Sequence, residues 1–279
     1  MITPLMPHPA ALIKTRETRT LIIADLHIGW EIALSEKGIH VPTQTPKLLK
    51  KLKTLIEKYK PENLLILGDV KHTVATAEIS EWQDVPDFFN TIKNHVKRIQ
   101  IIRGNHDGNL EPLLPESIEL LHSTGTAIDQ AGLFHGHRWP SLTLLNCKTL
   151  VMGHIHPVIV LRDPAGFRIT RQVWVKAKCN PYQLAEALIK KHEANPKKST
   201  EETLAKNVSK PKTSQIFILP SFNDFLGGKP LNEKKAKDLK NKELLGPVLR
   251  SEAVDMENAE IYLLDGTFLG TLKQLKIPS

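Results

Sequence analysis

The stretch IQIIRGNHD, residues 99–107, decides how this sequence folds and where its chemistry lies. Its isoleucine-rich half is typical of a buried β-strand. The strand pattern stops at Gly104, and an amide, an imidazole and a carboxylate follow directly. All three groups can bind a metal ion or a proton. The stretch therefore predicts a buried strand that ends in a functional loop.

Four other stretches repeat this arrangement, in which a short apolar run ends abruptly in polar residues. They are TLIIADLH (20–27), ENLLILGD (62–69), GLFHGH (132–137) and TLVMGHIH (149–156). Amphipathic helices are predicted between the early strands. Such alternation predicts an α/β fold, in which the chemistry collects at the carboxyl ends of the strands. We therefore expect the five polar clusters to form one site.

Two helices are predicted in the first half of the chain. TPKLLKKLKTLIEKYK (45–60) has a helical apolar face, with Thr45 as the expected N-cap and Pro46 at the first helical position. SEWQDVPDFFNTIKNHV (80–96) is a second helical region. Because Pro86 has no backbone N–H, we expect this helix to begin afresh near Asp84.

After residue 156 the pattern changes mainly to strands. FRITRQVWVKAKC (167–179) alternates, and one face carries Ile169, Arg171, Val173, Val175, Ala177 and Cys179. NPYQLAEALIKKH (180–192) predicts a helix capped at Asn180, and YLLDGTFLGTL (262–272) predicts a hairpin with a type I′ Asp-Gly turn. QIFILPSFNDFLGG (215–228) predicts a buried strand and a loop, in which Asn223 and Asp224 are expected to serve a turn rather than face the pocket.

The chain of 279 residues, 41% of them hydrophobic, is predicted to form a single domain over residues 1–279. We expect a flexible lysine-rich insertion at about 193–214 and a basic segment at about 229–243. Residues 190–212 contain seven lysines and three acidic residues, and residues 229–243 contain six lysines and three acidic residues. These two stretches therefore carry +7 of the net charge of +8. Solvated loops are the simpler interpretation, and a basic arm that binds a phosphate backbone is the alternative.

The sequence favours a cytoplasmic location with no membrane partner. Cys147 and Cys179 are too few for a disulfide framework. No apolar run approaches the roughly 18–20 residues that span a bilayer. The start, MITPLMPHPAALIKTRETRT, does not read as a signal peptide, because no basic segment leads into a continuous apolar stretch.

The five clusters together indicate a metal site. They are Asp25-x-His27, Gly68-Asp69, Gly104-Asn105-His106-Asp107, His135-Gly136-His137 and Gly153-His154-x-His156. Imidazoles, carboxylates and one amide form a mixed nitrogen and oxygen environment that suits Mn, Fe or Zn. Two divalent ions would exceed the charge of two ligand carboxylates and a bridging hydroxide, which leaves a positive pocket for a phosphate. Two metal ions 3.5–4 Å apart can activate a bridging water for in-line attack.

At these residues the sequence resembles the calcineurin-like metallophosphoesterase superfamily, whose signature is DxH, GDxx[D/H], GNH[D/E], a later His and GHxH. The resemblance covers about residues 20–160 and all five motifs. DLHIGWEIALSEKGIHVP, GHIHPVIVL and LPSFNDFLGG are similar, more narrowly, to the SbcD-related archaeal phosphoesterases and to bacterial relatives associated with DNA ligase and helicase genes. The resemblance implies a four-layer α/β/β/α sandwich, in which two mixed β-sheets pack face to face with helices outside.

The resemblance also implies a role for each motif residue. Asp25, His27 and His156 would hold the first metal ion, Asp69 would bridge both ions, and Asn105, His135 and His154 would complete the second. His106 would protonate the leaving oxygen, since imidazole titrates near neutrality. Asp107 would orient and charge that imidazole.

The sequence departs from the family pattern, or leaves a choice, at a few positions. In GDVKH (68–72), His72 occupies the position at which the family usually has an Asp. We expect His72 to support the ligands or line the pocket, with direct metal binding as the alternative. In FHGHRWP two histidines compete for one ligand position. The family pattern favours His135, which leaves His137 near the substrate or behind a ligand. Arg103 and Arg138 are candidates for phosphate contacts, although exposed loop arginines are common.

These observations predict a phosphoesterase with two divalent transition metal ions, with Mn²⁺ favoured over Fe or Zn, that hydrolyses a phosphodiester by attack of metal-bound hydroxide. The substrate is a phosphate ester, with DNA and small nucleotides as the two alternatives. The near-neutral core weighs against an extensive DNA groove, whereas the resemblance weighs for DNA. The other hypotheses are a non-catalytic scaffold and a nuclease subunit that requires a helicase, ATPase or ligase partner.

Overall fold

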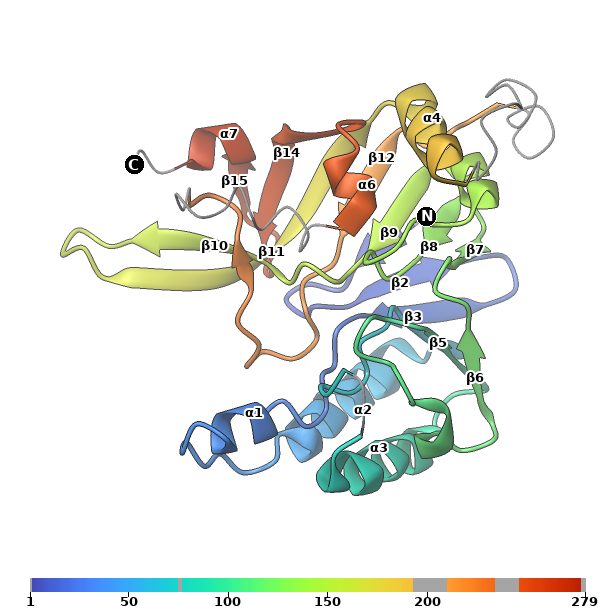
Figure 1. Cartoon of the computed structure of the whole chain (residues 1–279), viewed down its shortest axis with the longest axis vertical. Helices are drawn as coiled ribbons and strands as arrows, with labels where there is room; N and C mark the ends of the chain where they lie inside the picture. Colours follow the sequence, from blue (N-terminus) through green and yellow to red (C-terminus); the bar gives the residue numbers. More distant parts are fainter. Residues whose placement is uncertain (1, 75–76, 193–209, 234–245, 277–279) are drawn as a thin grey trace.

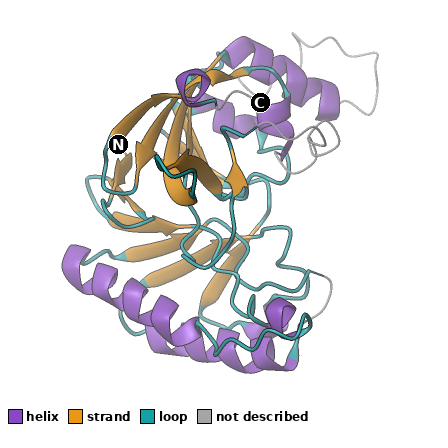
Figure 2. Cartoon of the chain, turned by 90° about the vertical axis from the view of Figure 1, so that its left-hand side faces the viewer, coloured by secondary structure: helices purple, strands orange, loops and turns teal. Residues whose placement is uncertain are grey.

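The computed structural model describes residues 2–74, 77–192, 210–233 and 246–276. Two β-sheets face each other, and helices cover the outer side of each sheet (Figure 2). This arrangement confirms the predicted four-layer α/β/β/α sandwich. None of the described helices is long and apolar enough to cross a membrane.

The first sheet has six strands in the order β1-β2-β3-β4-β5-β6. Its strands β2, β3, β5 and β6 are labelled in Figure 1. Their bounds are β1 Ile2–Pro4, β2 Ala11–Lys14, β3 Arg19–Ile23, β4 Asn63–Ile66, β5 Arg98–Ile102 and β6 Ile118–Leu121. Strands β3 to β6 are parallel, and β1 and β2 extend the sheet antiparallel from β3. The carboxyl ends of the three parallel strands β3, β4 and β5 therefore lie at the same edge of the sheet.

The second sheet has nine strands, with the path β13-β10-β11-β12-β9-β8-β7 and the hairpin β14-β15 paired to β11. Their bounds are β7 Thr126–Ile128, β8 Ala131–Leu133, β9 Thr149–Met152, β10 Pro157–Arg162, β11 Arg168–Cys179, β12 Gln215–Ile218, β13 Lys229–Pro230, β14 Val254–Leu263 and β15 Phe268–Thr271. Strands β8, β9 and β12 are parallel to one another. Their carboxyl ends form a second set of loops.

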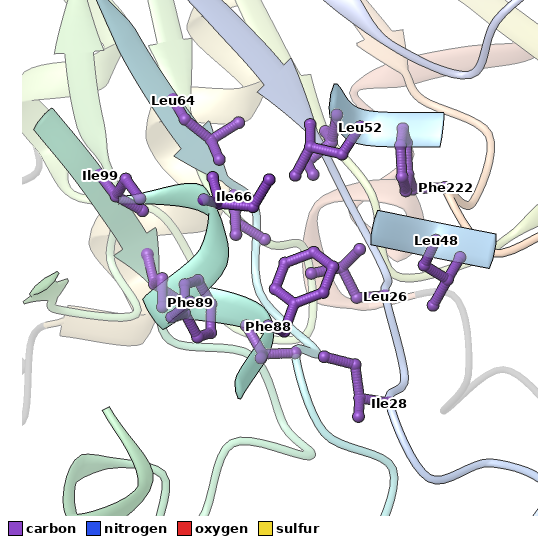
Figure 3. Packing of buried hydrophobic residues seen from close by; sticks show 14 of the residues in the cluster. Leu26, Ile28, Leu48, Leu52, Leu64, Ile66, Phe88, Phe89, Ile99 and Phe222 are labelled. Atoms are coloured by element: carbon purple, nitrogen blue, oxygen red, sulfur yellow. The ribbon is translucent and has the colours of Figure 1, made fainter. Parts of the chain in front are cut away.

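Three apolar clusters hold the layers together. Helices α2 (Thr45–Tyr59) and α3 (Ile79–Ile92) pack on the first sheet, where Figure 3 shows Leu52 and Phe88 among the buried side chains. Ile22, Leu65, Trp174 and Phe217 belong to the cluster between the sheets. The outer elements of the second sheet are α4 Pro181–His192, α6 Gly246–Arg250, α7 Leu272–Leu275 and the 3-10 helix η2 Leu142–Asn146. The short helices α1 (Ile32–Ser35) and η1 (Glu111–Leu113) complete the fold.

Three local predictions were wrong. Helix α3 runs through Pro86 and begins at Ile79, because Glu78 and Glu81 form a capping box there. The N-cap of α2 is Gln44, since Thr45 is already helical and its hydroxyl donates to Asp84. The predicted type I′ turn is absent from the β14-β15 hairpin, whose connection is longer than two residues. A type I′ turn needs positive φ angles at two successive residues, and of Asp265 and Gly266 only Gly266 has a positive φ.

The predicted N-terminal cap of α4 is confirmed. Asn180 caps α4, because its side-chain oxygen accepts the backbone N–H groups of residues 182 and 183. Of the predicted insertion at 193–214, residues 193–209 lie outside the described residues, whereas Thr213 is buried and donates to the Cys147 carbonyl. Most of the basic segment at 229–243 also lies outside the described residues.

Candidate metal centre

The five polar clusters lie directly after five strands, each of which is parallel to a neighbour in its own sheet. Asp25 and His27 follow β3, Asp69 follows β4, Asn105 to Asp107 follow β5, His135 to His137 follow β8, and His154 and His156 follow β9. The first three strands belong to one sheet and the last two to the other. The cluster residues thus come together from both sheets, at the edge where the strands end.

The backbone turns sharply at these positions. Asp25, His27, Asp69, His154 and His156 all have positive φ angles, from 42° to 71°. This left-handed conformation is uncommon for residues other than glycine and often occurs at functional sites. Two loops support each other there, because the N–H groups of Asp25 and His27 donate to the carbonyls of Gly68 and Asp69 at 3.1 and 2.9 Å.

The first group of potential metal ligands is Asp25, His27, Asp69 and His156, whose ligand atoms lie within 4.8 Å of one another. His27 Nε2 is 3.4 Å from Asp69 Oδ2, and His156 Nε2 is 3.5 Å from Asp25 Oδ1. Both imidazole nitrogens are buried without a hydrogen-bond partner among the described residues. Because unpaired buried polar atoms are costly, this arrangement fits a cation held between them.

The second group consists of Asp69, His135 and His154, again with ligand atoms within 4.8 Å. His135 Nε2 lies 3.3 Å from Asp69 Oδ2 and 3.1 Å from Asn105 Oδ1. His135 Nδ1 donates to the carbonyl of Leu67 at 2.6 Å. This bond fixes the ring and leaves Nε2 available to a metal ion. Asp69 belongs to both groups.

The electrostatics of the pocket favour bound cations. Burial opposes ionisation of Asp69, but the neighbouring His135 and His27 hold the pKa of its carboxyl well below the usual value. Burial, followed by the charge of His135, lowers the pKa of His154 to about 4. Burial opposes protonation of His135, yet the carboxylates of Asp69 and Asp25 raise its pKa to about 9. The carboxylates thus attract positive charge, which a proton or a metal ion can supply.

His106 and Asp107 make different contacts from those predicted. The two carboxylate oxygens of Asp107 accept the backbone N–H groups of Gly104, Asp69 and Val70 at 2.7, 2.9 and 2.8 Å. Burial and the charge of Asp69 raise the pKa of Asp107 to about 6. The imidazole Nδ1 of His106 contacts the carbonyl oxygen of His72 rather than Asp107. The backbone N–H of His106 donates to Asp69 Oδ1 at 2.8 Å.

The other sequence candidates lie around this cluster. His72 Nδ1 is 3.2 Å from His27 Nδ1, and His72 also forms a potential three-histidine group with His27 and His106. The ring centroid of His137 lies 5.2 Å from that of His135, and its buried Nδ1 has no partner among the described residues. Arg138 is exposed, whereas the guanidinium of Arg103 pairs with Glu111.

Sequence reasoning missed one buried acid beside the site. The carboxylate of Glu81 accepts the N–H groups of His72 and Thr73 at 2.9 and 2.8 Å and also that of Glu78. Glu81 therefore holds the loop that carries His72. Its position three residues after Glu78 is the capping-box spacing, and this was the available signal.

Comparisons with known proteins give one family match and two similar structures. The model of the calcineurin-like phosphoesterase family matches residues 18–151. The nuclease MPE of Pseudomonas putida is 21% identical with a TM-score of 0.52, over 95% of this chain and 98% of that one, and this likeness shows a shared fold. Yfce, a phosphoesterase from E. coli, is 19% identical with a TM-score of 0.33, over 52% of this chain and 73% of that one. No curated protein matches the chain.

Proposed function

We propose that this chain, which belongs to the calcineurin-like phosphoesterase family through residues 18–151, hydrolyses phosphodiesters at a centre of two divalent metal ions. The family makes the chain a hydrolase of phosphate esters. The number of ions, the residue roles and the substrate are the proposal. The observation that carries it is the position of Asp69, which belongs to two ligand groups at once.

The ligand atoms divide into two half-sites. Asp25, His27 and His156 would hold one ion, Asn105, His135 and His154 would hold the other, and Asp69 would bridge them. When bound, the two ions would lower the pKa of a shared water and neutralise charge on the phosphoryl oxygens. Mn²⁺ is the proposed metal, with Fe and Zn as alternatives, because the donors are imidazole nitrogens and carboxylate or amide oxygens.

His106 is the proposed general acid. Its backbone is tied to Asp69, so the imidazole is held beside the proposed bridging ligand. Contact with the His72 carbonyl places a proton on Nδ1 and leaves Nε2 to carry the proton that the leaving oxygen needs. Asp107 would contribute by holding the backbone of both loops rather than by contacting this imidazole.

His72 is proposed to position two site residues without binding metal itself. Its Nδ1 can accept a hydrogen bond from Nδ1–H of His27, which would keep His27 Nε2 free for a metal ion. Its carbonyl oxygen orients His106. His137 and Arg138 are proposed to face the substrate, and the ion pair of Arg103 with Glu111 makes Arg103 the weaker phosphate contact.

A phosphodiester is the preferred substrate class, and nucleic acid is the preferred form of it. The similar structure from Pseudomonas putida is described as a nuclease, which supports this choice. A small nucleotide is the second candidate. A non-catalytic scaffold is disfavoured because all the proposed metal ligands and His106 are present. Activity that requires a helicase, ATPase or ligase partner is the remaining alternative. Cys147 and Cys179 are buried and form no disulfide, which favours a reducing compartment such as the cytoplasm.

The test compares Mn²⁺-reconstituted protein on bis-p-nitrophenyl phosphate, p-nitrophenyl phosphate, cyclic nucleotides, and single- and double-stranded DNA, with and without a helicase, ATPase or ligase. We expect two ions per chain and the fastest turnover on diesters. Asp69→Asn should lose both metal and turnover, whereas the exposed control Asp255→Asn should keep them. Absence of bound metal after reconstitution, or full activity of Asp69→Asn, would overturn the proposal.

A further inference from the structure

Three consecutive carbonyls, at residues 24–26 of the loop that carries Asp25 and His27, accept hydrogen bonds from a segment almost two hundred residues away. The carbonyl of Ala24 accepts the backbone N–H of Phe222 at 2.8 Å. The carbonyl of Asp25 accepts the hydroxyl of Ser221 at 3.0 Å, and this hydroxyl is shared with the carbonyl of Asn223 at 3.1 Å. The carbonyl of Leu26 accepts the side-chain amide of Asn223 at 2.9 Å. Ser221 and Asn223 are both fully buried.

These bonds meet a need created by the backbone of the metal loop. Asp25 and His27 have φ angles of 58° and 43°, and left-handed residues other than glycine persist only where the surrounding structure fixes them. The N–H groups of Asp25 and His27 already donate to the loop after β4. Ser221 and Asn223 donate hydrogen bonds to the carbonyls of Asp25 and Leu26, so the loop is held from both sides.

The donor segment is itself firmly anchored. Phe222 is buried in the helix-side core of the first sheet, with Leu26, Leu48 and Leu52 in the same cluster (Figure 3). The ammonium of Lys51 on α2 donates to the Phe222 carbonyl at 2.8 Å and pairs with Asp224 at 2.7 Å. The segment therefore connects the end of β12 in the second sheet to the core of the first.

We propose that Ser221 and Asn223 are positioning residues for the first half of the metal centre. Resting on the proposed function, this inference assigns them the task of holding Asp25 and His27 in the backbone conformation that points both side chains at one ion. They lie outside residues 18–151, the part that the family model matches. The first half of the metal centre thus depends on the segment that follows β12.

The matched control is Asn232, a second buried asparagine in the same part of the chain. Its side chain bonds the backbone of Val160 with an amide donor at 2.8 Å and an accepted N–H at 2.9 Å. Asn232→Ala therefore removes comparable hydrogen bonds without contacting the metal loop. Ser221→Ala is the smaller change at the loop and serves if Asn223→Ala does not fold.

Two measurements on the full chain test the inference. The first is Mn²⁺ binding by calorimetry and by electron paramagnetic resonance. Residues that support metal ligands typically contribute ~10–100-fold in metal affinity. We expect Asn223→Ala to lower the affinity for one of the two Mn²⁺ ions by at least about tenfold. Ser221→Ala should lower it less. The second is hydrogen exchange of the metal-free protein, where amides of residues 24–28 should exchange faster in both variants but not in Asn232→Ala.

The outcomes separate the two proposals. Wild-type protein that binds no Mn²⁺ refutes the dinuclear centre, and hydrogen exchange then still decides whether residues 221 and 223 hold the loop. Two bound ions with unchanged affinity and unchanged exchange in both variants refute the positioning role alone. Equal losses of affinity in Asn223→Ala and Asn232→Ala also refute it, because they would reflect general destabilisation.

Discussion

The carboxylate of Asp107 accepts the backbone N–H of Asp69, with 2.9 Å between Oδ2 and nitrogen. The same carboxylate accepts the N–H groups of Gly104 and Val70, so one buried side chain links the loop after β5 to the loop after β4. Asp69 in turn accepts the N–H of His106 on its own carboxylate. The proposed bridging ligand and the proposed general acid are thus fixed to each other through Asp107.

Asp107→Asn should therefore destabilise the fold and weaken metal binding together. The new amide group cannot accept all three N–H groups, and a buried unpaired donor costs about 1–3 kcal/mol. Urea unfolding and Mn²⁺ titration measure the two effects. The control is Asp265→Asn, which alters an exposed carboxylate that accepts the N–H of Thr267. Normal stability with an altered pH profile of turnover would favour the sequence prediction, in which Asp107 acts on the His106 imidazole.

The difference between the two roles of Asp107 shows what the sequence could predict. Strand ends are readable because an apolar run followed by Gly, Asp or His leaves a local pattern, as in IQIIRGNHD. All five predicted strands are present, and their parallel order brings the polar residues together. The partner of a carboxylate within the loop is not readable, because it depends on which backbone N–H groups the loop turns inward.

Long-range support was the other part that the sequence could not give. Asn223 contacts Leu26 across 197 positions, and no spacing relates the two. The sequence pattern of Asn223 is that of an ordinary turn residue, and its Oδ1 indeed accepts the N–H of Phe225. Only the crossing of the segment from one sheet to the other brings its amide group to the metal loop.

Gly104→Ala should displace Asp69. A methyl group at this position would lie 2.2 Å from Asp69 Oδ1 and 2.4 Å from the Asp69 nitrogen, and the latter is backbone that cannot move aside cheaply. We expect loss of turnover and of metal affinity in a protein that still folds. Gly227→Ala is the matched control, because apart from its chain neighbours no atom of the described residues lies within 4 Å of a methyl group there. Wild-type metal affinity in Gly104→Ala would show that the two loops are less closely packed than described.

Glu62 should make stability depend on pH in the acid range. Its side chain accepts hydrogen bonds from the guanidinium and the backbone N–H of Arg19, and they lower the pKa of Glu62 from 4.5 to about 2. A lowered folded-state pKa stabilises the protein above the unfolded value, and this contribution is lost as pH falls from 4.5 towards 2. The urea midpoint of Glu62→Gln should therefore be below that of wild type at neutral pH, and the gap should narrow with acidification. A constant gap between Glu62→Gln and wild type across this pH range would contradict the assignment.

Metal binding should stabilise the fold, because the ligands come from loops of both sheets. An ion that binds only the folded state adds about 2.7 kcal/mol when its concentration is a hundred times the dissociation constant. Mn²⁺ should therefore raise the melting temperature of chelator-treated protein in a concentration-dependent way. His154→Ala removes one proposed ligand of the second ion and should keep part of the rise, whereas Asp69→Asn should abolish it, since Asp69 belongs to both groups. If Mn²⁺ raised the melting temperature of Asp69→Asn as much as that of wild type, the stabilising metal would bind elsewhere. This result would contradict the proposal that Asp69 is a ligand shared by both ions.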